Sequence, residues 1–247
     1  MEKHRTIVVT GASRGIGAEI AGELARRGHA VACLSRSGSP PDVHDAVGLA
    51  DLFFCLRCDV SREDDLRAAF GQVAERFGGI DGLVNNAGIH RDGASRAFPT
   101  AEFETVLRIN AVSVFAACRE VYPYLVQSGD GLIVNIGSFF ERLGAKGSTA
   151  YCAAKAAVGA ITRCLAAEWG RKGISVLNVA PGYIETDINR DYLSDPEHGQ
   201  KVRSRTFTGR PGTPDEIARL VAALFTERIG FLTGESIYVD GGHSISL

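Results

Sequence analysis

Short, continuously apolar runs recur along this chain of 247 residues, separated by longer amphipathic stretches. Ile7-Val8-Val9 and Leu132-Ile133-Val134 contain no polar residue, so neither run has a face suited to solvent. A strand that is apolar on both sides has to be covered on both sides, which is typical of a parallel sheet with helices on each face. The alternation of strand and helix patterns therefore predicts a doubly wound α/β fold.

The same alternation continues along the whole chain. We find no internal repeat, low-complexity segment or linker-like break, so we expect one domain over residues 1–247, with a dinucleotide-binding half at about 1–135 and a catalytic and substrate half at about 136–247. The pattern predicts about seven strands, at Thr6 to Thr10, Ala30 to Ser35, Leu52 to Cys58, Gly82 to Asn85, Leu132 to Ile136, Ser175 to Val179 and Ser236 to Val239. Helices are expected at Gly15 to Gly28, Glu63 to Phe77, Ala101 to Ser128 (one helix or two), about Ala150 to Gly170, and Pro214 to Phe225.

Composition excludes several classes of function. The formal charge is −2 and the pI about 6.3, so no basic surface for nucleic acid or anionic lipid is indicated. No apolar run approaches the roughly 18 residues that a membrane span needs. The first residues, Met1 to Arg5, are charged and lack the apolar stretch of a signal peptide. We therefore expect a cytoplasmic protein with no nucleic-acid or membrane partner.

The six cysteines are interpreted as reduced thiols. Cys55 and Cys58 have the spacing of a zinc knuckle, but no second Cys/His pair follows at a suitable distance. Both fall in a predicted strand, where an odd offset of three residues points side chains to opposite faces. We expect no metal site.

The first predicted strand is followed by Thr10-Gly11-Ala12-Ser13-Arg14-Gly15-Ile16-Gly17, which leads directly into a helix. A strand, a glycine loop and a helix form the usual cradle for a pyrophosphate, because glycine permits close backbone approach and the helix N-terminus offers free N–H groups. The spacing Gly-x-x-x-Gly-x-Gly differs from the common dinucleotide fingerprint. An ordinary turn between strand and helix is the alternative interpretation.

The end of the second predicted strand indicates which dinucleotide binds. An NAD site usually places Asp or Glu there, about 20 residues on, to bind the ribose 2′-hydroxyl. This chain instead has Ser35-Arg36-Ser37, with no carboxylate before Asp42. Arg36 and Arg14 are suited to hold a 2′-phosphate, since a guanidinium matches phosphate oxygens. We predict a preference for NADP(H) over NAD(H); the alternative is two solvated loop arginines.

With these residues in view, the chain resembles the short-chain dehydrogenase/reductase family over nearly its whole length. The resemblance implies a Rossmann-type fold, a nicotinamide cofactor and reaction at a CH–OH group. It rests on Thr10 to Gly17, Asp59-Val60, Asn85 to Gly88, a Tyr-x-x-x-Lys spacing, and Pro181 to Thr186. By this resemblance the cofactor contacts Gly11, Ser13, Arg14, Gly15, Ile16, Gly17, Arg36, Asp59, Val60, Asn86, Ala87, Gly88, Tyr151, Lys155, Pro181, Gly182, Ile184 and Thr186.

The resemblance also assigns Asn110, Ser138, Tyr151 and Lys155 as a catalytic tetrad. Lys155 stands one helical turn after Tyr151, so both lie on one helix face. Because tyrosine ordinarily has a pKa near 10, we expect the charge of Lys155, together with that of oxidised nicotinamide, to lower that pKa toward the working range. Ser138 is expected to stabilise charge on the substrate oxygen. The resemblance implies that Asn110 holds a water and that Lys155 binds the nicotinamide ribose.

The substrate is less constrained. The segments 178–187, 209–218 and 232–242 resemble the 3-oxoacyl-acyl-carrier-protein reductases, although sugar, polyol and other secondary-alcohol dehydrogenases share them. Bulky residues at 139–142 replace the small residues of many acyl-carrier reductases, which argues against a wide pocket for a carrier-bound chain. A 3-oxoacyl reductase and an alcohol dehydrogenase of the same family both remain open.

Ser138, Phe140, Tyr151 and Tyr183 are expected to contact the substrate, and Phe139 and Glu141 to border its pocket. Glu141 and Arg142 alternatively form a solvated pair, and His90 is interpreted as an ordinary loop histidine. The polar segment Ile188 to Phe207 is predicted to be a mobile lid.

Apolar surface on the helices around Ala101 to Ser128 and Ala150 to Gly170, together with the family pattern, predicts a homotetramer. A non-catalytic NADP(H)-sensing protein is the rival of another class, as is an epimerase or dehydratase with a larger C-terminal domain. The retained tetrad argues against the first, and the short chain after the last strand against the second.

Overall fold

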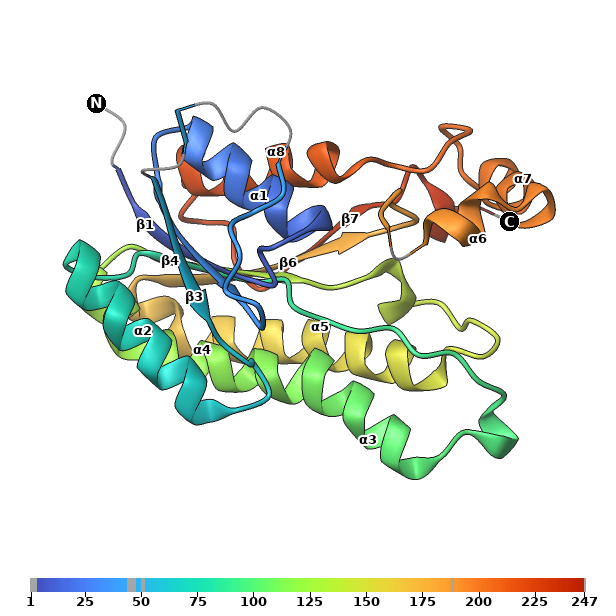
Figure 1. Cartoon of the computed structure of the whole chain (residues 1–247), viewed down its shortest axis with the longest axis horizontal. Helices are drawn as coiled ribbons and strands as arrows, with labels where there is room; N and C mark the ends of the chain where they lie inside the picture. Colours follow the sequence, from blue (N-terminus) through green and yellow to red (C-terminus); the bar gives the residue numbers. More distant parts are fainter. Residues whose placement is uncertain (1–3, 44–47, 50–51, 188, 247) are drawn as a thin grey trace.

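The computed structural model describes residues 4–43, 48–49, 52–187 and 189–246. In this part of the chain the strands form one seven-stranded sheet in the order β3-β2-β1-β4-β5-β6-β7, and every neighbouring pair is parallel (Figure 1). The predicted fold class is confirmed. The strands are β1 (Thr6–Thr10), β2 (Ala30–Ser35), β3 (Phe53–Arg57), β4 (Gly82–Asn85), β5 (Gly131–Ile136), β6 (Ile174–Pro181) and β7 (Ser236–Val239).

Helices cover both faces of this sheet. Figure 1 shows α1 and α8 on one side, and α2, α4 and α5 on the other. Within the described ranges, no helix is both long and apolar enough to cross a membrane. The helices are α1 (Gly15–Arg26), α2 (Glu63–Phe77), α3 (Thr100–Leu107), α4 (Ser113–Ser128), α5 (Thr149–Trp169), α6 (Arg190–Ser194), α7 (Pro196–Arg205) and α8 (Pro214–Glu227).

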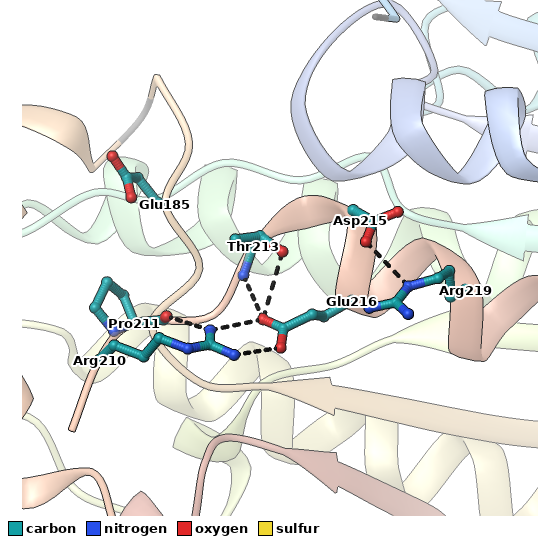
Figure 2. Close-up of a pocket in the computed structure, with 7 residues that line it drawn as sticks. All are labelled: Glu185, Arg210, Pro211, Thr213, Asp215, Glu216 and Arg219. Carbon is teal, nitrogen blue, oxygen red and sulfur yellow. Dashed lines mark hydrogen bonds and ion pairs between the residues drawn. The ribbon is translucent and has the colours of Figure 1, made fainter. Parts of the chain in front are cut away.

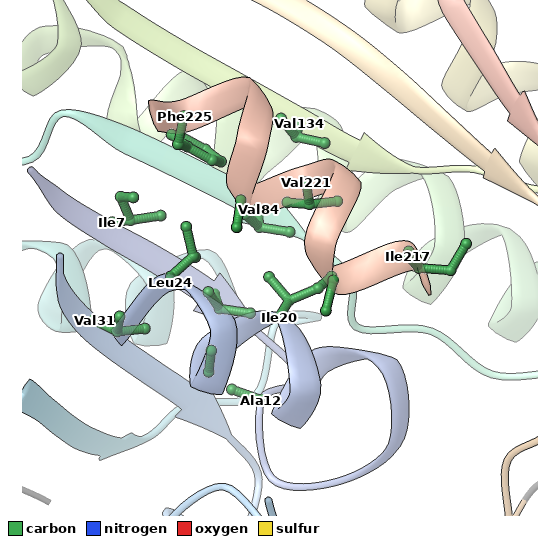
Figure 3. Close-up of a cluster of buried hydrophobic side chains, with 14 of the residues drawn as sticks. Ile7, Ala12, Ile20, Leu24, Val31, Val84, Val134, Ile217, Val221 and Phe225 are labelled. Atoms are coloured by element: carbon green, nitrogen blue, oxygen red, sulfur yellow. The ribbon is translucent and has the colours of Figure 1, made fainter. Parts of the chain in front are cut away.

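Successive residues of one strand serve two different cores. Ile7 and Val9 belong to the core under α1 and α8, whereas Val8 belongs to the core under α2, α4 and α5. In Figure 3, Ile20 of α1 and Val221 of α8 meet above the strands in the first of these cores. These side chains are fully buried, so truncation of any of the larger ones to alanine should cost about 2–5 kcal/mol. Burial on both faces explains the continuous apolar runs.

The cysteines follow the same alternation. Cys55 packs against the core under α1 and α8, while Cys58 lies in the core on the opposite face. The expectation that the two thiols face opposite sides of the sheet is therefore confirmed. All six cysteines are free thiols.

The loops that carry the predicted site residues gather at one edge of the sheet. The strand order reverses between β1 and β4, and ligands of open α/β sheets bind outside the carboxyl ends of strands at such a point. The glycine loop follows β1, Asn86 follows β4, Ser138 follows β5, and the segment 182–186 follows β6.

The opposite edge of the sheet is held together by charge. The carboxylate of Asp130, just before β5, forms ion pairs with Arg5, before β1, and with Arg228, after α8. Both arginine side chains are largely buried. Arg228 has a φ of 45°, a left-handed conformation that costs a non-glycine residue free energy. The ion pair with Asp130 fixes it there.

Two segments were predicted only coarsely: one helix or two over Ala101 to Ser128, and a lid over Ile188 to Phe207. The apolar pattern from Ala101 to Ser128 is divided into α3 and α4 by a π-helical turn at Arg108–Val112. The segment predicted as a lid forms α6 and α7; its first residue, Ile188, lies outside the described residues. Capping rather than apolar spacing accounts for α7, because the Asp195 side chain accepts a 2.9 Å hydrogen bond from the His198 N–H.

Candidate active site

The glycines after β1 allow a backbone approach that no side chain would permit. Gly11 has a φ of +67°, and a Cβ built on it would lie 2.8 Å from the Cα of Ala87. A Cβ on Gly17 would lie 2.3 Å from both the Gly11 carbonyl oxygen and the Asn86 amide nitrogen. The first turn of α1 is therefore packed directly against the segment that follows β4.

The start of α1 is open to an anion. Helix α1 has no side-chain cap and no acidic residue in its first turn, so its first N–H groups are available. A Cβ on Gly15, whose φ is +57°, would meet only the Thr186 methyl group, at 3.8 Å. Backbone donors, a positive dipole end and a cradle of glycine fit the pyrophosphate of a dinucleotide. Ile16 packs into the core below and anchors this turn.

Hydrogen bonds lock the loop after β1 to the loop after β4. The side-chain amide of Asn86 donates to the carbonyl oxygens of Thr10 and Gly11, at 3.1 Å each. The backbone N–H groups of Asn86 and Ala87 donate to the Thr10 hydroxyl, at 3.0 and 3.1 Å. The motif residues of both loops thus hold one another in place.

Asp59 and Val60 lie just beyond the end of β3, after Cys58. Hydrogen bonds from Ser61 to the Asp59 carboxylate hold the pKa of that carboxyl below its ordinary value, with a smaller contribution from the charge of Arg36. Val60 is half-buried against the core under α2. One face of the Asp59 carboxylate is therefore fixed by Ser61.

Arg14 and Arg36 are both exposed. Among the described residues, no carboxylate lies within ion-pair distance of either guanidinium. The Ser13 carbonyl oxygen accepts a 3.1 Å hydrogen bond from the Asp42 N–H, which ties the glycine loop to the chain after β2. Arg14 belongs to the glycine loop and Arg36 directly follows β2, and both side chains are exposed.

Ser138, Tyr151 and Lys155 come together from two elements. Ser138 follows β5, and its side chain lies close enough to the Tyr151 phenol on α5 to favour the ionised form of that phenol. Lys155, one turn further along α5, donates a 2.7 Å hydrogen bond from Nζ to the Ile136 carbonyl oxygen. The same Nζ lies 5.6 Å from the centroid of the Tyr151 ring. The structure therefore assembles three of the four predicted catalytic side chains in one place.

The fourth residue, Asn110, lies in the π-helical turn between α3 and α4. Its Nδ2 donates to the carbonyl oxygens of Ile89 and Val106, at 2.9 and 3.1 Å, and its Oδ1 accepts from the Ile89 N–H at 3.0 Å. A Cβ on Gly88 would lie 2.6 Å from that Oδ1. π-Helical turns are frequent at functional sites, and this one fastens α3 and α4 to the segment after β4.

Burial dominates the protonation of the site. It raises the pKa of Tyr151 to about 12, while the neighbouring Ser138 side chain acts in the opposite direction. Burial also lowers the pKa of Lys155 to about 8, and the negative charge of Glu141 opposes that shift. The expected lowering of the tyrosine pKa by Lys155 is therefore not found in the protein alone. At neutral pH the phenol is protonated and ready to donate.

The segment after β6 is anchored at both ends. Pro181 closes β6, and a Cβ on Gly182 would lie 2.7 Å from the Cβ of Asp240. Ile184 is buried, and the Thr186 N–H donates a 2.9 Å hydrogen bond to the Asn189 side chain. Thr186 therefore lies opposite the glycine loop, where its methyl group is the nearest atom to a Cβ built on Gly15.

Known proteins are similar to this chain over nearly its whole length. The sequence profile of the enoyl-(acyl carrier protein) reductase family matches residues 11–244. The chain belongs to the short-chain dehydrogenase/reductase family. It is 36% identical over 238 residues to a 3-oxoacyl-acyl-carrier-protein reductase of Vibrio cholerae, covering 96% of each chain. It is 33% identical to 3beta-hydroxysteroid dehydrogenase 1 of Eggerthella lenta, covering 98% of this chain and 95% of that protein.

A solved structure agrees with both sequence matches. The crystal structure of a gluconate 5-dehydrogenase from Burkholderia cenocepacia, in complex with NADP and tartrate, has a TM-score of 0.92 and 32% identity, covering 100% of this chain and 97% of that one. As a short-chain dehydrogenase/reductase, this chain is a nicotinamide-dependent oxidoreductase that acts on CH–OH groups.

One residue beside the site, His90, was not found by sequence reasoning. The His90 ring lies edge-on to the Tyr151 ring, with centroids 4.6 Å apart, although it was interpreted as an ordinary loop histidine. Its only sequence signal is its position directly after the Asn-Asn-Ala-Gly segment. Glu141 and Arg142 do not form a pair: Glu141 accepts a hydrogen bond from the Tyr238 hydroxyl, and the Arg142 guanidinium lies 4.2 Å from the Tyr238 ring centroid.

A depression of about 370 Å³ lies apart from the tetrad (Figure 2). Four of its charged side chains form two ion pairs: Arg210 bonds Glu216, and Arg219 bonds Asp215. Glu216 also completes a capping box with Thr213 at the start of α8. Because Gly212 pairs with Ile184 in an isolated bridge, we interpret this region as a support for the segment after β6. It is lined by Glu185, Arg210, Pro211, Thr213, Asp215, Glu216 and Arg219.

Proposed function

We propose that this oxidoreductase interconverts a ketone and a secondary alcohol with NADP(H), using Tyr151 as its proton donor and acceptor. The observation that supports this most directly is the convergence of Tyr151, Ser138 and Lys155 at the carboxyl edge of the sheet. A bound nicotinamide supplies the hydride, or accepts it, at the carbonyl carbon. Residues 1–247 act together in this proposal as one catalytic unit.

Each side chain has a distinct role in the reducing direction. Tyr151 gives its phenolic proton to the substrate oxygen as negative charge grows there. Ser138 donates a hydrogen bond to the same oxygen and stabilises that charge. The Lys155 ammonium stabilises the tyrosinate left behind and binds the ribose of the nicotinamide. A water at Asn110 replaces the proton from solvent in this proposal; a group other than the Asn110 amide N–H atoms binds it, because these already donate to Ile89 and Val106.

The preference for NADP(H) over NAD(H) is proposed from Arg14 and Arg36. Both guanidiniums flank the glycine loop without a described ion-pair partner, and a 2′-phosphate offers the oxygens that a guanidinium fork matches. No carboxylate stands at the end of β2, where an NAD site would use one. Comparable kcat/KM values for NADPH and NADH would contradict this preference.

Two substrate classes follow from the relatives. A 3-oxoacyl thioester is the first candidate, because the reductase of Vibrio cholerae carries that name. A sugar acid, polyol or other secondary alcohol is the second, because the neighbouring solved structure is a gluconate dehydrogenase. We propose the carbonyl chemistry for this chain and treat both classes as its first test substrates.

We also propose that the protein is cytoplasmic and forms a homotetramer. Val112, Phe115 and Val126 expose 39–51% of their surface on or beside α4, and apolar surface of this kind is usually covered by a partner. Symmetric pairing of α4 and α5 between subunits would cover it. A monomer in sedimentation at micromolar concentration would contradict the assembly.

The test of the function compares two matched variants. Tyr151→Phe removes the phenolic hydroxyl, so NADPH oxidation with any reducible ketone or thioester should fall by about a thousandfold, while NADPH still binds. Tyr124→Phe removes a hydroxyl near the end of α4 and should leave turnover unchanged. Near-normal turnover of Tyr151→Phe would refute the role of the phenol.

A further inference from the structure

Aromatic side chains from two different loops surround the phenol of Tyr151. The Phe140 ring, just after β5, stands edge-on to the Tyr151 ring, with centroids 6.3 Å apart and planes at 87°. The His90 ring, after β4, also stands edge-on, at 4.6 Å and 68°. The substrate must therefore reach the proton donor between rings.

A buried ring supports the rings that line this approach. Phe139 is only 2% exposed, and it stacks on Phe140 with centroids 4.3 Å apart. Tyr183, from the segment after β6, stands edge-on to both, at 5.3 Å from Phe139 and 6.2 Å from Phe140. Phe140 and Tyr183 are half-buried, so each keeps some ring surface for a ligand while Phe139 fixes its orientation.

The aromatic surface continues onto α6 and α7. Tyr192 of α6 stacks parallel to Tyr183, with centroids 6.0 Å apart and planes at 11°. His198 of α7 stacks in turn on Tyr192, at 4.4 Å and 18°. A continuous series of rings thus connects the residues beside Tyr151 with the two helices that follow the β6 segment.

The nearest polar side chains bond mainly to one another. The Ser148 hydroxyl donates a 2.7 Å hydrogen bond to the Asp92 carboxylate. His90 Nε2 lies 3.3 Å from the Ser148 hydroxyl and 3.2 Å from the same Asp92 oxygen. These three groups therefore already have partners, and rings make up much of the surface around Phe140 and Tyr183.

From this arrangement we propose that the substrate carries its carbonyl on a flat, apolar, ring-bearing group that packs against Phe140 and Tyr183. The proposal rests on the proposed function and narrows its substrate class. Each edge-to-face or offset ring contact is worth a factor of roughly 2 to 12 in affinity beyond area burial. A polyol would lose hydrogen bonds to water against these rings, and a flexible acyl chain would lose more conformational entropy than a rigid ring.

The experiment uses two methyl ketones of equal carbon number, 4-phenyl-2-butanone and 2-decanone, with saturating NADPH. The kcat/KM of the wild-type protein should be at least about fivefold higher for the phenyl ketone. Phe140→Leu keeps apolar volume but removes the ring, so this ratio should fall toward one, mainly through the KM of the phenyl ketone. Phe231→Leu, at a fully exposed phenylalanine, should leave the ratio unchanged.

Several outcomes would overturn the proposal: a wild-type ratio of one or less, an equal loss for both ketones in Phe140→Leu, or higher kcat/KM for D-fructose or acetoacetyl-coenzyme A. Calorimetric binding of both ketones to the NADPH complex separates the two levels of inference. Preferential binding of the phenyl ketone without turnover would contradict the proposed function alone. If Phe140→Leu does not fold, as judged by its melting curve, Tyr183→Leu takes its place.

Discussion

The carboxylate of Glu141 accepts a 2.6 Å hydrogen bond from the side-chain amide of Asn178. Its other oxygen accepts from the Tyr238 hydroxyl, so the carboxylate is held in one position. A Cβ on Gly159, one helical turn beyond Lys155, would lie 3.3 Å from it. Glu141 therefore places a fixed negative charge beside the stretch of α5 that carries the buried ammonium.

The first prediction concerns pH. Lys155 is charged below its pKa of about 8, and burial lowers that pKa while Glu141 raises it. Removing the anion in Glu141→Gln disfavours the charged form, so the pKa falls further. The kcat/KM for ketone reduction should then decline from a lower pH than in the wild type. Glu168→Gln, at an exposed position near the end of α5, should leave the profile in place; coincident profiles for all three proteins would exclude the effect.

The second prediction concerns the direction of reaction. Burial raises the pKa of Tyr151 to about 12, so the phenol is protonated through the neutral range. Reduction needs that proton, whereas alcohol oxidation needs the tyrosinate. Oxidative kcat/KM should therefore rise between pH 7 and 9 while reductive kcat/KM stays level or falls. An oxidation rate that is constant over this range would show that the phenol is already acidic in the working enzyme.

The third prediction concerns the cofactor loop. A Cβ at Gly17 would meet the Gly11 carbonyl oxygen and the Asn86 amide at 2.3 Å. Gly17→Ala should therefore destabilise the fold by about 1–3 kcal/mol and weaken NADPH binding, as read by melting temperature and by titration. Gly71→Ala, in α2 with nothing near its missing Cβ, should be neutral or stabilising. Equal losses of melting temperature and NADPH affinity in both variants would show that close packing at Gly17 is not the cause.

The fourth prediction concerns the choice between cofactors. Arg36→Leu removes a guanidinium proposed to bind the 2′-phosphate, so kcat/KM with NADPH should fall by about tenfold or more, in keeping with the strength of charged hydrogen bonds. The value with NADH should change little. Arg171→Leu, at an exposed position beyond α5, is the control. A parallel loss with both cofactors would indicate a structural role for Arg36 instead.

Sequence patterns predict this fold well because the central strands β1, β4, β5 and β6 are buried on both faces. Ile7 to Val9 have no polar residue to mislead the assignment, and β1, β2, β4, β7 and α2 have the predicted bounds. The loops after the strands follow, since a parallel sheet gathers its carboxyl ends at one edge. The π-helical turn at Asn110 has no such signal, because a single inserted residue leaves the apolar spacing of its flanking helices almost unchanged.

Long-range contacts account for what the sequence did not predict. His90 meets Tyr151 only because β4 and α5 deliver them to the same edge. The bonds from Glu141 to Asn178 and Tyr238 join residues far apart in the chain. The direction in which the Tyr151 pKa shifts depends on how completely the phenol is desolvated, and no local sequence pattern predicts that.

The ion pairs of Asp130 with Arg5 and Arg228 stabilise the fold at a distance from the candidate active site. They fasten the starts of two central strands and the end of α8 at the edge opposite the candidate active site. Substitutions at these three residues should lower the melting temperature, while the protein that remains folded keeps its kcat and KM. The ring-lined loops at the other edge of the sheet do not take part in these ion pairs. Substitutions in those loops can therefore change substrate specificity without weakening this part of the fold.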